Sequence, residues 1–135
     1  CGIAAAVRAL KPDTRLYAAE VATAAPLKAA LSAGAPVEVA YTPSFVDGIG
    51  SKTVFPQMLA RARGLIDGAL VTPLDAVAAA LRLLAERNRV IAEGAGACPV
   101  ACALDGQARG GKVVCVVSGG NIDPALHQRI TGEAA

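Results

Sequence analysis

Hydrophobic and polar positions follow two different periods along this chain, and each period predicts its own kind of element. The clearest helical stretch is Pro73–Arg87, in which Val77, Leu81 and Leu84 recur at the spacing of one helix face. The clearest strand is Lys112–Val117, a continuous apolar run of the kind that a parallel sheet buries on both faces. Together the two patterns predict helices packed against a parallel sheet.

The remaining segments continue this alternation. Proline and glycine mark several boundaries, since Pro12 stops a helix, Pro26 suits a first helical turn and Gly34 suits the position after a last turn. The other predicted helices are Gly2–Leu10, Ala25–Ala33, Pro56–Arg63, Glu93–Leu104 and Asp123–Ile130. The other predicted strands are Arg15–Glu20 and Leu65–Val71, with a loop over Val37–Phe55 and a turn over Asp105–Gly111. This order predicts an α/β fold, a parallel sheet with flanking helices.

Composition limits the classes of protein. A length of 135 residues predicts one domain, and a net charge of +2, with basic and acidic residues interspersed, argues against a nucleic-acid partner. Apolar runs fall short of the roughly 18 residues that span a bilayer, so we expect a cytoplasmic protein without a membrane segment. Cys98 and Cys102 could share a helix face, but with His127 as the only histidine we expect no metal site.

The strongest candidate for chemistry is the segment Ser118-Gly119-Gly120-Asn121, which follows the predicted strand directly. Ligands of open α/β sheets bind at the carboxyl ends of strands, where glycines let a flat ligand approach the backbone and a serine hydroxyl can bond a ring nitrogen. A tight turn between strand and helix would have the same glycines without any ligand. The pattern by itself leaves both interpretations open.

Four segments carry a resemblance to one enzyme family. In chain order they are Arg15–Glu20, Phe45–Ile49, Glu93–Ala97 and VVCVVSGGNID at residues 113–123. The last resembles the closing motif of the serine/threonine dehydratase and serine racemase group of pyridoxal-phosphate enzymes of fold type II. Glu93–Ala97 resembles that group's glutamate-led segment of glycines and alanines, Phe45–Ile49 its Ala-Asp-Gly segment, and Arg15–Glu20 its strand that ends in glutamate. The resemblance covers essentially the whole chain and implies that residues 1–135 are the C-terminal part of the large domain of such an enzyme.

The resemblance also implies roles for six residues around pyridoxal 5'-phosphate. Ser118 would bond the pyridine nitrogen, and Gly119, Gly120 and Asn121 would shape the loop beneath the ring. A serine partner leaves that nitrogen unprotonated, which favours elimination of a substrate hydroxyl. Glu93 and Gly48 would line the same pocket, although Glu93 could instead cap the helix that follows it.

Two departures from the family limit what the chain itself can do. The family's Schiff-base lysine and phosphate-binding loop correspond to positions before Cys1, so we expect no catalytic residue within the chain. Some relatives hold a divalent cation with a glutamate, a carbonyl oxygen and a further acidic residue, which fall here on Glu20, Ala24 and Pro26. Because proline has no side-chain oxygen, we expect no cation site there.

These observations lead to a first hypothesis and an alternative from another class. The first is part of a lyase that converts threonine or serine to a 2-keto acid and ammonia, inactive as this fragment, with an amino-acid racemase as a close variant. The alternative is a non-catalytic α/β domain, as a fragment or a homo-oligomer, with a small ligand at most at Ser118. Absorbance of bound pyridoxal phosphate would distinguish them.

Overall fold

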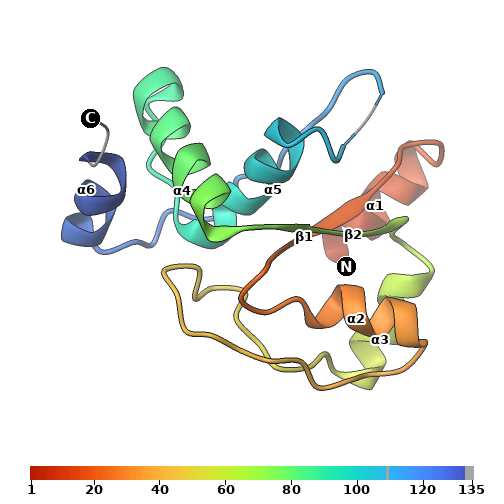
Figure 1. The fold of residues 1–135 in the computed structure, drawn as a ribbon. Coiled ribbons are helices and arrows are strands. Elements are labelled where there is room, and N and C mark those ends of the chain that lie inside the picture. Colours follow the sequence, from red (N-terminus) through yellow and green to blue (C-terminus); the bar gives the residue numbers. More distant parts are fainter. Residues whose placement is uncertain (109, 133–135) are drawn as a thin grey trace.

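The computed structural model describes residues 1–108 and 110–132 as a two-stranded parallel sheet with helices on both faces (Figure 1). The strands are β1 (Tyr17–Val21) and β2 (Gly68–Thr72). The helices are α1 (Gly2–Leu10), α2 (Pro26–Ala33), α3 (Pro56–Arg63), α4 (Leu74–Leu83), the π-helical turn η1 (Leu84–Asn88), α5 (Gly94–Leu104) and α6 (Pro124–Gly132). Among these helices of the described residues, none is both long and apolar enough to cross a bilayer.

The two strands pair in parallel with Tyr17 opposite Gly68 and Val21 opposite Thr72. Parallel pairing requires a crossover connection, and here α2 and α3 lie in that crossover. Figure 1 shows α4 and α5 on one side of the strands and α2 and α3 on the other. The α/β fold with flanking helices, predicted from the sequence, is therefore confirmed.

The core lies between the sheet and the pair α4 and α5. Val77 and Leu81 of α4 are fully buried there, together with Val21 at the end of β1. Val46 also enters this core, 2% exposed, although it belongs to the long loop after α2. Phe45 and Ile49 of the same loop pack against this core as well, so apolar side chains hold a loop that has no regular element.

Local signals located most helix boundaries correctly. Pro26 begins α2, and Gly34 after it has a φ of 74°, the left-handed conformation that glycine adopts without strain. The predicted helix Pro73–Arg87 is present as α4, which continues into η1. Residue 109 in the predicted turn lies outside the described residues, as do residues 133–135 of the predicted domain.

The predicted strand Lys112–Val117 is the main error. Residues 112–117 are extended but pair with no strand among the described residues, and Val114 is 87% exposed. Cys115 and Val117 face inward and are half-buried, so only one side of the segment is covered. An apolar run predicts that a segment can be buried, but its burial requires a neighbouring strand, which this segment lacks within the described chain.

Candidate functional site

Three segments that are distant in the sequence meet around the start of α5. They are the loop that contains Gly48, the residues Ile91–Gly96, and the turn that begins at Ser118. All three are rich in small residues, which lets their backbones approach one another closely. Three of the four segments singled out in the sequence therefore lie together, although Gly48 and Ser118 are 70 residues apart in the chain.

The turn after Val117 is held by contacts with the backbone before and within α5. The N–H of Glu93 donates to the carbonyl of Gly119 at 3.0 Å. A methyl group added at Gly96 would lie 2.7 Å from that same carbonyl oxygen, and one added at Gly120 would lie 2.6 Å from the carbonyl oxygen of Ile91. Both glycines are therefore required by the packing of backbone on backbone.

Glu93 points its carboxylate into the space between the Gly48 loop and Gly119. A methyl group at Gly48 would lie 3.6 Å from Glu93 Oε1 and 3.1 Å from the Cβ of Ala95, and one at Gly119 would overlap the carboxylate outright. Glu93 occupies the N-cap position of α5, but its side chain makes no capping hydrogen bond. The alternative that Glu93 simply caps this helix through its side chain is therefore wrong.

Ser118 and Asn121 lie on the exposed side of the same turn. Asp123 ends the turn as predicted, because its Oδ1 accepts the N–H of Leu126 at 2.8 Å in the first turn of α6. The structure thus brings Gly48, Glu93 and Gly119 into contact, with Ser118 and Gly120 adjacent in the chain. Asn121 lies beyond them on the exposed surface, towards α6.

This arrangement fits one part of a pyridoxal-phosphate site. The exposed hydroxyl of Ser118 can form a hydrogen bond with a ring nitrogen. Gly119 and Gly120, which have no side chains, leave room for the ring to lie against the turn. The atoms nearest to Gly119 and Gly120 belong to Glu93, Gly96 and Ile91. The residues of this turn therefore fit a contact with the ring of the cofactor.

Two polar residues outside the motifs hold the Gly48 loop in place. Thr23 and Ser44 share a hydrogen bond between hydroxyls at 3.4 Å, and the N–H of Thr42 donates to the carbonyl of Thr23 at 3.0 Å. These contacts join the loop to the carboxyl end of β1. Neither residue belongs to a motif, so the sequence indicates them only through their positions near the ends of a strand and a loop.

Glu20 lies one residue before the end of β1, which reaches Val21 and not the predicted Glu20, and its side chain is only 8% exposed. Its Oε1 accepts the N–H of Leu27 and its Oε2 the N–H of Lys28, both at 2.8 Å. Burial raises the pKa of Glu20 above its ordinary value, and these two N–H groups oppose that shift. The carboxylate of Glu20 therefore joins the end of β1 to the start of α2.

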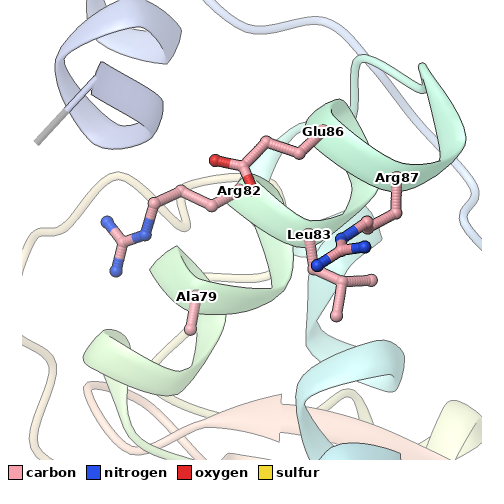
Figure 2. Close-up of a pocket in the computed structure, with 5 residues that line it drawn as sticks. All are labelled: Ala79, Arg82, Leu83, Glu86 and Arg87. Carbon is pink, nitrogen blue, oxygen red and sulfur yellow. The ribbon is translucent and has the colours of Figure 1, made fainter. Parts of the chain in front are cut away.

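A separate hollow lies on the outer surface of α4 and η1 (Figure 2). It measures about 280 Å³ and is lined by Ala79, Arg82, Leu83, Glu86 and Arg87. Arg82 Nη1 donates to the carbonyl of Ile130 at 2.7 Å and so connects α4 with α6. Because its lining comes from one continuous helical stretch and its arginine already supports packing, this hollow is not the candidate site.

Comparisons with known proteins agree with the motifs. A family model described as "Pyridoxal-phosphate dependent enzyme" matches residues 1–119. The L-threonine ammonia-lyase of Geobacter sulfurreducens is 37% identical over 124 residues, which are 90% of this chain and 31% of that protein. Among solved structures, threonine deaminase isoform 2 of Solanum lycopersicum has a TM-score of 0.85 and 25% identity, over 99% of this chain and 40% of that one.

Maize serine racemase is similar to the same degree, with a TM-score of 0.84 and 28% identity over 98% of this chain and 44% of that one. The chain spans less than half the length of each of these relatives. The similarity extends to the whole arrangement of helices and strands, and so covers the exposed segment 112–117 as well as the paired strands.

Proposed function

Since this chain belongs to the pyridoxal-phosphate-dependent enzyme family, we propose that it is part of a lyase that deaminates threonine or serine. The products would be a 2-keto acid and ammonia. Relatives that carry the names threonine ammonia-lyase and threonine deaminase support the reaction class. The chain would be one part of a longer enzyme, since each relative is more than twice as long as the matched region, and the order of its motifs suggests the C-terminal part of the large domain.

The observation that carries the proposal is the meeting of Gly48, Glu93 and Gly119 beside an exposed Ser118 hydroxyl. These are four of the six residues that the family resemblance assigned to the cofactor, and they come from three separate segments. A tight turn alone would explain the glycines of the turn. It would not explain why a carboxylate without a hydrogen-bond partner among the described residues points at that turn from another segment.

Each residue has a defined task in the proposed site. The Ser118 hydroxyl would bond the ring nitrogen, and Gly119 and Gly120 would keep side chains away from the face of the ring. Glu93 and Gly48 would close the opposite wall, where the carboxylate can hold a proton or orient a donor group. When bound, the cofactor supplies an electron sink for cleavage of bonds at the substrate α-carbon.

The test uses the longest polypeptide that the gene encodes, incubated with pyridoxal phosphate. We expect a visible absorbance band from the bound cofactor, and release of 2-keto acid and ammonia from L-threonine or L-serine. The substitution Ser118→Ala should weaken cofactor binding about tenfold, because one hydrogen bond to a ring nitrogen is worth about 1.4 kcal/mol. Ser32→Ala, on the exposed face of α2, serves as the matched control.

The outcomes separate the hypotheses. Chiral analysis that finds the D-amino acid in place of keto acid would identify a racemase, which the similarity to maize serine racemase makes the second candidate. A polypeptide that stays colourless with pyridoxal phosphate would contradict the enzyme and favour a non-catalytic domain. Equal cofactor affinity in Ser118→Ala and Ser32→Ala would contradict the proposed role of Ser118 alone.

A further inference from the structure

The carboxyl end of β1 corresponds to the place where some members of the dehydratase and racemase group hold a divalent cation, but one of the three positions here is a proline. The corresponding positions are Glu20, the carbonyl of Ala24, and Pro26. We propose that Glu20 has a structural role, in which its carboxylate joins β1 to α2 through hydrogen bonds. Mg²⁺ and Ca²⁺ then neither bind nor regulate the protein at this position. This inference does not depend on the proposed lyase activity.

The first argument is that the start of α2 is fully paired without a cation. Helices leave their first N–H groups without an intrahelical acceptor. In α2, Pro26 has no N–H, Leu27 and Lys28 donate to the two oxygens of Glu20, and Ala29 donates to the carbonyl of Ala25 at 3.3 Å. Every donor of this turn therefore has an acceptor, and both oxygens of Glu20 are in use.

The second argument concerns charge and ligand number. Ca²⁺ and Mg²⁺ require about six or more oxygen ligands, usually with several carboxylates or waters. Pro26 supplies no carboxylate, and Lys28 places a positive charge close enough to Glu20 to affect its titration. Across residues 1–108 and 110–132 no group of three or more acidic, cysteine or histidine side chains is arranged to hold a metal.

The third argument is what a cation would displace. Glu20 is 8% exposed, so turning its carboxylate towards a cation would leave the N–H groups of Leu27 and Lys28 unpaired in a partly buried place. The positive end of the helix dipole already supplies the favourable charge that a cation would provide. The Glu20 carboxylate therefore joins β1 to α2 and is not available as a cation ligand.

The experiment measures thermal unfolding of the longest encoded polypeptide after treatment with a chelator, with and without millimolar MgCl₂ or CaCl₂. We expect the same Tm in all three conditions. Glu20→Ala should lower Tm by about 5 °C, because two N–H groups lose their acceptors. The matched control is Glu38→Ala, an exposed glutamate in the loop after α2, which should leave Tm unchanged.

A saturable rise of Tm with either salt, lost in Glu20→Ala, would overturn the inference. A Tm of Glu20→Ala equal to that of Glu38→Ala would contradict the structural role of Glu20 between β1 and α2. A salt effect that persists in Glu20→Ala arises at another place and supports the assignment of Glu20. If Glu20→Ala does not fold, Glu20→Gln, which keeps one acceptor oxygen, should fold with a smaller decrease, and a saturable salt response there would also contradict the inference.

Discussion

Replacing Gly119 with alanine tests the contact on which the candidate site depends. The added methyl carbon would lie 2.8 Å from Cδ of Glu93 and closer still to Oε1. Non-bonded carbon atoms pack best at about 3.5–4.0 Å, so the side chain of Glu93 has to move. We therefore expect the consequence of Gly119→Ala to depend on Glu93.

The expected magnitude follows from how easily Glu93 can move. Its carboxylate makes no hydrogen bond or ion pair with the described residues, so its displacement costs mainly a change of rotamer. A poor rotamer costs about 0.5–1.5 kcal/mol, and we expect Gly119→Ala to lower the free energy of unfolding by about 1 kcal/mol. Gly120→Ala should cost more, about 2–3 kcal/mol, because its methyl group meets the backbone carbonyl of Ile91 at 2.6 Å.

The assay is urea unfolding of the longest encoded polypeptide and its variants. Shortening Glu93 to alanine removes the obstacle, so Glu93→Ala with Gly119→Ala should be about 1 kcal/mol more stable than the sum of the single effects predicts. The same Glu93→Ala should not rescue Gly120→Ala. Gly64→Ala is the control, since Gly64 has a helical φ of −86° and nothing within 4 Å of an added methyl group.

Two results would refute this reasoning. Additive effects of Glu93→Ala and Gly119→Ala would mean that the carboxylate does not face the turn. A Gly120→Ala variant as stable as Gly64→Ala would mean that the turn does not lie against Ile91. Either result would remove the geometry that supports the proposed cofactor seat, whatever the enzymatic activity.

Two further predictions concern the acid stability of the fold and its cysteines. The hydrogen bond from the N–H of Leu16, and to a smaller extent the neighbouring Arg8, lowers the pKa of Asp67. The stabilisation by the Asp67 carboxylate is therefore present above about pH 4 and is lost as pH falls through the lowered pKa. Asp67→Asn should lower the free energy of unfolding by under about 1 kcal/mol at pH 7, since the Arg8–Asp67 pair at 2.6 Å is partly exposed. In urea unfolding, this difference from the wild type should shrink in acid. The control Asp13→Asn, at an exposed position, should match the wild type. Burial raises the pKa of Cys98 to about 12 and that of Cys102 to about 11, so iodoacetamide at pH 8 should label exposed Cys1 while these two thiols stay unlabelled until urea unfolds the chain. Labelling of Cys98 as fast as Cys1, measured by peptide mass spectrometry, would contradict its burial.

The sequence predicted best the features that depend on neighbouring residues. Pro26 and Gly34 determine where α2 begins and ends, and Asp123 caps α6, all through contacts within a few residues. The segment 112–117 was predicted wrongly, because pairing of a strand depends on another strand that can be distant in the sequence or on another chain. Its apolar run indicates only that the segment is suited to burial.

For the candidate site, motifs predicted which residues meet but not how they meet. The sequence marked Glu93 as either a cap or part of the pocket, and only the structure shows that its carboxylate leaves the helix and faces Gly119. The engagement of Glu20 by the N–H groups of Leu27 and Lys28 could have been anticipated, because a glutamate six residues before a helix start can reach the first turn of that helix. The 2.8 Å lengths of these two hydrogen bonds could not be predicted from the sequence.

The glycines of the Ser118 turn therefore carry less functional information than the motif suggests. Gly96 and Gly120 are required because backbone carbonyls lie 2.7 Å and 2.6 Å from where a methyl group would be, and this packing would need glycine even if no ligand ever bound. Ser118 is different, because it is exposed and the packing of the turn does not require its hydroxyl. Cofactor affinity in Ser118→Ala, rather than any glycine substitution, therefore tests the proposed contact between this turn and the cofactor.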